Sequence, residues 1–349
     1  MNQTSIIIIG GGQSGLAAGY FLQRSKVPFV ILDGQPQPGG AWQQGWESLR
    51  LFSPAEHSSL PGWLMPKGEQ GNPSRQEVID YLSQYEQRYK LPVQRPVTVG
   101  QVNRMEAGYE LQTSAGTWQA KAVISATGTW SKPFIPDYPG LEVFKGKQVH
   151  SAFYRYPEEV AGQRVAVIGG GNSAAQILAE VSEVATTTWF TLEPPKFLPD
   201  EVDGRYLFEF ATRQYKAKLE GKKLEPSGGL GDIVMVESVK AARERGVLVT
   251  QPVFEHFTER GVVLADGSTQ DFDAVIWCTG FRAALDHLAP LNVIEPNGGI
   301  ELQGNQSVKS PGLWLLGYGA WTGFASATLI GVGRTAKEVA AEACRSLGI

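Results

Sequence analysis

Two glycine-rich segments with nearly the same sequence are the parts of this chain best suited to chemistry. "IIIIGGGQSG" occupies residues 6–15 and "VAVIGGGNSA" occupies residues 165–174. A glycine-rich turn between an apolar strand and a helix presents backbone N–H groups at the positive end of the helix, where a phosphate can bind. Glycine is entropically costly to order. Two such turns therefore predict two phosphate-bearing ligands.

The residues around the first loop follow the order of a dinucleotide site. Residues 6–9 predict a buried parallel strand, the segment after the loop has helical apolar spacing, and "VPFVILD" predicts a second strand that ends in an acid. Gly10 is expected to make the tight turn, Gly12 to admit a pyrophosphate and Gly15 to let helix and strand pack closely. Asp33 is placed to bind an adenosine ribose.

The second loop repeats this plan with small changes. Gly169 and Gly171 stand in the first two glycine positions, and Ala174 replaces the third glycine, which widens the helix–strand contact by one methyl group. Glu193 lies close to the position that Asp33 holds in the first repeat. The commonest chemistry that needs two dinucleotides is hydride transfer from a nicotinamide to a flavin. We therefore expect FAD in one loop and NADH or NADPH in the other.

The remainder of the chain assigns FAD to the first loop. In "QPQPGGAW", Gly40 permits a close approach of backbone to a flat ring system, which Trp42 can cover. "AVISATG" (122–128) and "AVIWCTG" (274–280) predict paired strands at the crossings between two domains. The predicted fold is α/β with two Rossmann-like domains. A nicotinamide domain (158–274) is inserted into a FAD domain (1–157 and 275–349).

The chain ends in a predicted strand, a glycine-rich turn and a long amphipathic helix. We expect the helix N-terminus near residues 322–325, where its dipole would face a reduced flavin anion. The residues expected to bind the two cofactors are those of the loops, the turns and the acidic positions: Gly10, Gly12, Gln13, Ser14, Gly15, Asp33, Gly40, Trp42, Thr127, Gly128, Gly169, Gly171, Asn172, Ser173, Glu193, Thr279, Gly280 and Thr322.

Composition narrows the class of protein. The chain has 349 residues, 42% of them hydrophobic, and a formal net charge of -4, which gives no reason to expect nucleic acid or an anionic membrane as a partner. Cys278 and Cys344 form no CxxC pair, and no histidine has metal-ligand spacing, so no metal is expected. Without a predicted signal peptide or membrane span, we expect a cytoplasmic protein.

A further motif carries a family resemblance. "FKGKQVHSAFY", residues 144–154, matches the pattern FxGxxxHxxxY/F and stands just before the second loop. With the two loops and "GGAW", the chain resembles the class B flavoprotein monooxygenases, the flavin-containing and Baeyer–Villiger group, in a small bacterial form. The resemblance implies that NAD(P)H reduces FAD and that dioxygen forms a C4a-hydroperoxyflavin. This species oxygenates a small organic substrate such as a thioether or a ketone. The resemblance also marks His150 as a residue of the family's fingerprint motif.

The chain departs from this family at two positions. Phe52 occupies the place where many relatives carry an asparagine above the flavin, so it is either a flavin-facing residue or ordinary core. Glu193 stands where NADPH-dependent relatives tend to carry arginine. A carboxylate at this position favours NADH over NADPH. Four aromatic residues, Phe197, Tyr206, Phe208 and Phe210, either line a substrate entrance or pack internally.

Other functions of the same scaffold remain open from sequence. A disulfide reductase needs a redox-active cysteine pair, which this chain cannot supply. An NAD(P)H oxidase or a quinone or ferredoxin reductase is the main alternative, and a non-catalytic flavin sensor is another. Oxygenated organic product separates a monooxygenase from an oxidase. A homodimer is left open.

Overall fold

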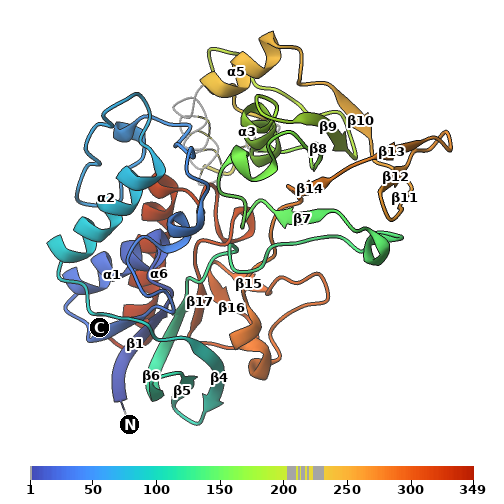
Figure 1. Cartoon of the computed structure of the whole chain (residues 1–349). Helices are drawn as coiled ribbons and strands as arrows, with labels where there is room; N and C mark the ends of the chain where they lie inside the picture. Colours follow the sequence, from blue (N-terminus) through green and yellow to red (C-terminus); the bar gives the residue numbers. More distant parts are fainter. Residues whose placement is uncertain (1, 203–209, 211–212, 214–216, 218–219, 223–231) are drawn as a thin grey trace. The chain divides into compact units, whose positions relative to one another are not determined.

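The computed structural model describes residues 2–202, 210, 213, 217, 220–222 and 232–349 (Figure 1). The chain divides into two compact units. The first comprises Met1–Gln43, Ser53–Lys132 and Arg282–Ile349, and the second comprises Gln44–Phe52 and Pro133–Phe281. The second unit is thus inserted into the sequence of the first, and the segment 44–52 belongs to the second unit as well. The cofactor-domain boundaries expected at 157/158 and 274/275 stay a prediction.

The first unit is built on a nine-stranded sheet. The path β15-β16-β17-β6-β1-β2-β3 is extended by β5, which pairs with β6, and by β4, which pairs with β5. The strands are β1 (Asn2–Ile9), β2 (Phe29–Leu32), β3 (Val93–Gln94), β4 (Val99–Met105), β5 (Gly108–Thr113), β6 (Gly116–Ser125), β15 (Leu302–Gln303), β16 (Gln306–Ser307) and β17 (Leu313–Leu315). Its helices are α1 (Gln13–Arg24), α2 (Arg75–Arg88) and α6 (Leu329–Ser346), with short 3-10 turns η1 (Gly40–Gln44), η2 (Ala55–His57), η5 (Asp286–Leu291) and η6 (Ala320–Thr322).

The core of the first unit explains its apolar strands. β1 pairs in parallel with β2 and β6, and its residues Ile6–Ile9 are buried. Helices α1 and α6 pack against each other beside the sheet (Figure 1). A strand covered on both faces needs apolar side chains in succession rather than in alternation. The expected strand–loop–helix–strand order around the first loop is therefore observed.

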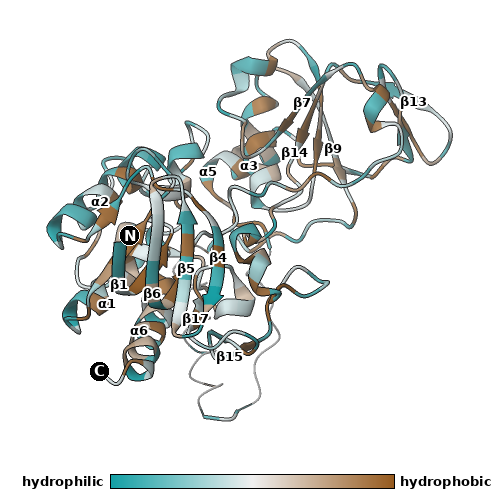
Figure 2. Cartoon of the chain, turned by 90° about the horizontal axis from the view of Figure 1, so that it is seen from below, coloured by the Kyte–Doolittle hydropathy of each residue, from teal (hydrophilic) through white to brown (hydrophobic). Residues whose placement is uncertain are grey.

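The second unit carries a five-stranded parallel sheet of order β10-β9-β8-β14-β7 and a small antiparallel sheet β11-β12-β13. Its strands are β7 (Lys147–His150), β8 (Arg164–Ile168), β9 (Thr186–Thr191), β10 (Thr250–Pro252), β11 (His256–Phe257), β12 (Gly261–Val263), β13 (Thr269–Asp271) and β14 (Ala274–Trp277). The helices bounded within its described residues are α3 (Asn172–Val181) and α5 (Glu237–Glu244), with 3-10 turns η3 (Leu141–Val143) and η4 (Pro157–Val160). Figure 2 shows β14, whose sequence is AVIW, mostly in the brown of hydrophobic residues.

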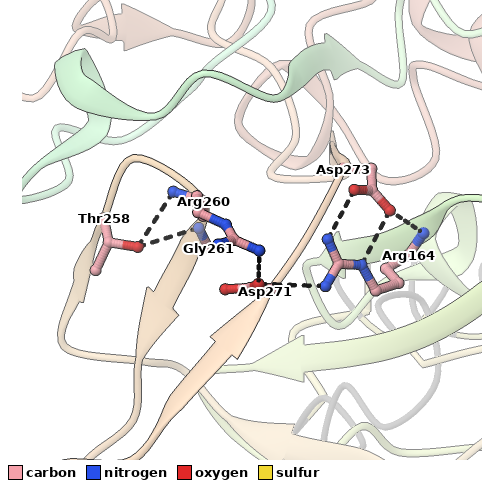
Figure 3. Close-up of polar contacts among 6 residues, drawn as sticks. All are labelled: Arg164, Thr258, Arg260, Gly261, Asp271 and Asp273. Carbon is pink, nitrogen blue, oxygen red and sulfur yellow. Dashed lines mark hydrogen bonds and ion pairs between the residues drawn. The ribbon is translucent and has the colours of Figure 1, made fainter.

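Charged side chains join the small antiparallel sheet to the parallel one (Figure 3). Arg164, at the start of β8, pairs with Asp273 at 2.8 Å and with Asp271 at 3.4 Å, and Asp271 also pairs with Arg260 at 2.8 Å. The hydrogen bond from Arg164 lowers the pKa of Asp273 to about 2. Because these groups are partly exposed, the pairs contribute little to the free energy of unfolding. They orient the hairpin that precedes β14.

The fold class expected from the sequence can be compared with the structure directly. The predicted α/β class with two Rossmann-like repeats is confirmed, since β8, α3 and β9 repeat the order of β1, α1 and β2. Tyr206 and Phe208, two of the four aromatic residues expected either to line a substrate entrance or to pack internally, lie outside the described residues. Within the described part of the chain, no helix has the length and apolar character to cross a membrane.

Candidate functional site

The first glycine loop is shaped by contacts within the protein at two of its positions. Gly10 has φ +104°, and a Cβ there would lie 2.6 Å from the Ala126 carbonyl oxygen. A Cβ on Gly15 would lie 1.9 Å from the Gly10 carbonyl oxygen. Side chains at either position would overlap backbone atoms. The tight turn and the close helix–strand contact therefore both depend on glycine.

Gly12 is different, because nothing in the protein requires a glycine there. Its φ is -78° and its ψ is -172°, a conformation open to any residue. The atom nearest to a Cβ placed on it is Gly40 Cα, at 3.8 Å. Space is therefore left beside the N-terminus of α1. This fits a ligand pyrophosphate held against backbone N–H groups.

In the second loop, too, the protein itself requires glycine at one position and leaves another open. Gly169 has φ +130°, and a Cβ on it would lie 2.2 Å from the Cys278 carbonyl oxygen. Gly171 has φ -104° and ψ -174°, and no described atom comes within 4 Å of its Cβ position. Ala174 is buried, as its replacement of the third glycine allows. The residues present thus fit a dinucleotide in each unit.

The ATG turn after β6 is pinned by a returning segment of the first unit. Thr127 Oγ1 donates a hydrogen bond to the Ala284 carbonyl at 2.7 Å, and the Ala284 N–H donates to the Gly128 carbonyl at 2.9 Å. The hydroxyl of Thr127 is therefore occupied by protein. The contact of Thr127 and Gly128 with a cofactor stays a prediction.

The CTG turn after β14 is held by equivalent contacts in the second unit. Thr279 Oγ1 donates to the Phe134 carbonyl, and the Phe134 N–H donates to the Gly280 carbonyl at 3.0 Å. His150, the fingerprint histidine, lies 3.0 Å from the same carbonyl through Nε2, and its Nδ1 accepts from the Ala152 N–H at 3.1 Å. Burial lowers the pKa of His150, although the bond to Gly280 opposes this. His150 is thus a neutral clamp on the turn.

The other fingerprint residues also have positions with clear physical causes. A Cβ on Gly146 would lie 2.3 Å from the Phe144 ring, so the buried phenylalanine requires the glycine. Tyr154 is fully buried and donates to Glu180 of α3 at 2.5 Å, and Ser48 donates to the other oxygen of Glu180. Burial raises the pKa of Glu180 above its usual range. The motif therefore connects β7, α3 and the segment 44–52.

Gln13 and Asn172, at equivalent positions in the two loops, bind protein through their side chains. Gln13 donates to the Ala327 carbonyl at 2.6 Å and accepts from Trp42 Nε1 at 3.3 Å. Asn172 accepts from the Val234 N–H at 2.8 Å. Each side chain ties its loop to a distant segment. The cofactor contacts expected of these two residues, and of the neighbouring Ser14 and Ser173, stay a prediction.

The acidic position of the first repeat has partners that the sequence did not reveal. Asp33 Oδ2 accepts from Arg95 Nε at 2.7 Å, and Arg95 Nη1 donates to Glu86 at 2.7 Å. Burial by itself would lower the pKa of Arg95, but the hydrogen bond to Glu86 and the two carboxylate charges raise it. Among the described residues, Arg95 Nη2 and Glu86 Oε2 are buried without a hydrogen-bond partner.

The acidic position of the second repeat is open by contrast. Glu193 and its neighbours Leu192 and Lys196 are exposed, with Leu192 at 87%. The Glu193 backbone oxygen lies 3.9 Å from the Cβ position of Gly170, the middle glycine of the second loop. Glu193 therefore stands beside the loop on a solvated rim.

Phe52 lies among apolar side chains of the second unit. It packs against buried Leu198 and Val234, with Val202 and Val236 beside them. Its position over a flavin stays a prediction. Phe197 is 37% exposed, and Phe210 is buried.

The expected helix N-terminus at residues 322–325 is wrong. Helix α6 begins at Leu329, and Thr328 caps it by accepting from the Gly331 N–H. The preceding residues form a closed turn instead, in which Thr322 Oγ1 donates to the Gly319 carbonyl at 3.0 Å and accepts from the Tyr318 N–H. The positive φ of Gly319, Gly323 and Ala325 prevents helix from starting earlier.

A buried polar network lies behind the ATG turn. The hydroxyl of Tyr318 is 2.6 Å from Ser125 Oγ and 2.7 Å from Thr127 Oγ1, and Ser125 Oγ is 2.9 Å from His287 Nε2. Burial lowers the pKa of His287 to about 4, although the charge of Asp286 opposes this. The network fixes the turn with a neutral histidine.

This network makes the first unit sensitive to acid. An unfolded histidine takes up a proton below about pH 6.5, whereas folded His287 resists protonation down to about pH 4. Its contribution to stability is therefore present above pH 6.5 and is lost as the pH falls to 4. Between pH 6.5 and 5 the free energy of unfolding should fall by about 2 kcal/mol. Urea unfolding of the unaltered protein and of His287→Gln at several pH values measures the contribution of His287 to the free energy of unfolding. An equal pH dependence in both proteins would contradict it.

No metal centre is found in the described residues, since no group of His, Cys, Asp or Glu side chains there could hold an ion. Cys278 and Cys344 are buried and free. Burial raises the pKa of Cys278 strongly, so its thiol is not a ready nucleophile. Cys278 and Cys344 therefore do not form the reactive cysteine pair that a disulfide reductase needs.

Comparison with known proteins agrees with these features. The family model of the pyridine nucleotide-disulphide oxidoreductases matches residues 7–197. A flavin-containing monooxygenase from Stenotrophomonas maltophilia is 51% identical, with 99% of this chain and 100% of that chain covered and a TM-score of 0.91. The chain is a class B flavoprotein monooxygenase.

More distant relatives share the sequence pattern or the fold at lower identity. An uncharacterized oxidoreductase named CzcO-like, from Geobacillus kaustophilus, is 31% identical over 95% of this chain and 96% of its own length. A cyclohexanone monooxygenase structure is 17% identical with a TM-score of 0.70, covers all of this chain and 88% of its own, and shares the fold. With the 51% identical monooxygenase and the matching family model, the chain is an NAD(P)H- and O2-dependent oxidoreductase.

Proposed function

We propose that this monooxygenase binds FAD at the first loop and NADH or NADPH at the second, and transfers one oxygen atom from O2 to a small organic substrate. The proposed binding domains are residues 1–157 with 275–349 for FAD, and 158–274 for the nicotinamide. The observation that carries the assignment is the pair Gly12 and Gly171, where neither conformation nor packing demands glycine. A ligand pyrophosphate at each loop supplies the missing reason.

Bound at the first loop, FAD would supply the redox chemistry that links the nicotinamide to dioxygen. The net reaction consumes NAD(P)H, a proton and O2, and yields oxygenated substrate, NAD(P)+ and water. The chain's own contribution is to bind and orient. The two pinned turns hold backbone in place beside each loop, and Trp42 is fixed by Gln13.

A thioether is the substrate class that suits this site. A thioether sulfur is itself nucleophilic, so oxygen transfer to it needs no general base. The two buried histidines described above are both engaged in hydrogen bonds with protein groups, so the proposal assigns neither as a general base. Ketones are the second class, because the family includes Baeyer–Villiger enzymes.

The test is a product assay under 18O2 with methyl phenyl sulfide and with a small cyclic ketone. We expect 18O in the sulfoxide, formed in proportion to NAD(P)H consumed, with hydrogen peroxide as the minor product. If all NAD(P)H were recovered as peroxide with every substrate, the oxidase alternative would replace the proposal. Faster turnover with a quinone than with O2 would instead indicate a quinone reductase.

A further inference from the structure

The buried charges beside the first loop form a chain of three side chains. Glu86, Arg95 and Asp33 are linked by ion pairs of 2.7 Å each, and the side chains of Arg95 and Asp33 are only 11% and 6% exposed. Glu86 comes from helix α2, Arg95 follows β3 and Asp33 follows β2. Three separate segments of the first unit thus meet at the acidic position of the first repeat.

This chain of charges lies directly against the glycine loop. A Cβ on Gly11 would lie 2.6 Å from Asp33 Oδ2 and 2.9 Å from Arg95 Nη2. Gly11 stands at the variable position of the GxGxxG pattern, where the dinucleotide fold does not call for glycine. At the equivalent Gly170 of the second loop, the nearest atom is 3.8 Å away. The glycine at position 11 is therefore explained by the Asp33–Arg95 pair.

Stability alone does not account for Arg95. Its Nη2 and the Oε2 of Glu86 are buried without partners among the described residues, and such groups oppose folding. A buried ion pair is weak support for stability, but it fixes the direction of the groups it joins. Arg95 occupies one side of the Asp33 carboxylate through Nε and so limits how that carboxylate can turn.

We propose that Arg95 is a positioning residue for cofactor recognition: it holds the Asp33 carboxylate oriented toward the adenosine ribose of FAD, with Glu86 and Gly11 completing the arrangement. The inference rests on the proposed binding of FAD at the first loop. It predicts a role in choosing FAD over flavins that lack the adenosine half. It places no group of Arg95 on the reacting atoms.

The experiment measures FAD affinity rather than activity. The full-length enzyme is stripped of flavin and titrated with FAD or FMN, with flavin fluorescence as the signal. Arg95→Met is expected to weaken FAD binding roughly 10-fold or more and to change FMN binding less than about twofold. Arg95→Lys, which keeps the charge, should recover part of the FAD affinity. Equal losses for FAD and FMN, or no loss at all, would overturn the proposal.

A double-mutant cycle tests whether Arg95 acts through Asp33. In the Asp33→Asn background, Arg95→Met should cost little further FAD affinity, because the group that it positions is already impaired. Fully additive losses would mean that Arg95 acts independently, which contradicts the positioning role. If Asp33→Asn left FAD affinity unchanged while Gly12→Val abolished it, the proposed function would stand and this inference would fail. If neither variant affected FAD, the loop assignment itself would be wrong.

A matched glycine pair tests the same geometry if Arg95→Met does not fold. Gly11→Ala places a methyl group where the Asp33 and Arg95 side chains lie, whereas Gly170→Ala meets no atom closer than 3.8 Å. Gly11→Ala is expected to lower FAD affinity and leave nicotinamide affinity unchanged. Gly170→Ala should leave FAD affinity unchanged. Identical FAD affinities in the two variants would count against the proposal.

Discussion

Gly12→Val is expected to yield a folded but colourless protein. The backbone at Gly12 is extended, with φ at -78°, and the nearest atom to its Cβ position is 3.8 Å away, so the unliganded chain can accept a small side chain. The isopropyl group would occupy the space proposed for the FAD pyrophosphate. We expect FAD affinity to fall roughly 100-fold or more, because the overlap with a phosphate cannot be relieved by backbone that is held on both sides. Flavin absorbance per chain measures the loss.

The second loop offers a matched control. Gly171 is also extended and has no described atom within 4 Å of its Cβ position. Gly171→Val should remain yellow with full FAD, while its flavin is no longer reduced by NADH or NADPH at ordinary concentrations. Full FAD in the purified Gly12→Val protein would mean that the loop assignment is wrong. A colourless Gly171→Val protein would mean that the two loops were exchanged.

Glu193→Arg is expected to shift cofactor preference toward NADPH. The carboxylate of Glu193 suits the free 2′-hydroxyl of NADH and repels the 2′-phosphate of NADPH, whereas arginine binds that phosphate. Because Glu193 is exposed, solvent screens the charge, and we expect the ratio of kcat/KM for NADPH over NADH to rise roughly 10-fold rather than by the larger factor of a buried pair. Steady-state kinetics with both nucleotides measures the ratio.

Two further variants separate charge from position. Glu193→Gln removes the repulsion without adding a cation, so it should give an intermediate ratio. Lys196→Ala removes the exposed cation nearby in the same segment and should reduce any NADPH use by the unaltered enzyme. The unaltered enzyme should accept NADH at least as well as NADPH. A strong NADPH preference that Glu193→Arg does not change would show that another residue reads the ribose.

The two Rossmann-like repeats could be predicted because their signals are local. The run at residues 6–9, the glycines at 10, 12 and 15 and the acid at 33 lie within one short stretch, and each residue type acts on its immediate neighbours. The second repeat, from Val165 to Glu193, carries the same pattern. The fingerprint motif at residues 144–154 indicated the family, because it is also a short local pattern. The structure shows the predicted tight turn at Gly10 and the close helix–strand contact at Gly15, whereas the pyrophosphate contact of Gly12 stays a prediction.

Contacts between distant segments could not be predicted in this way. Arg95 is 62 residues from Asp33, and nothing in the sequence around either residue names the other. Helix α6 starts at Leu329 rather than at the expected residues 322–325, because hydroxyl side chains and positive φ angles close the turn before it. The partner of the Gln13 side chain, the Ala327 carbonyl, is 314 residues away and is equally invisible in the local sequence.

The sequence by itself therefore determined the fold class, the repeated loops and the family, since strand and helix periodicity and glycine spacing depend on near neighbours. Only the tertiary structure decided which polar side chains are occupied by protein and which positions leave room for a ligand. It also decided that residues 44–52 join the second unit. The physical reason is that hydrogen-bond partners and free volume are properties of segments brought together by burial of apolar surface, and that burial constrains spacing along the chain only weakly.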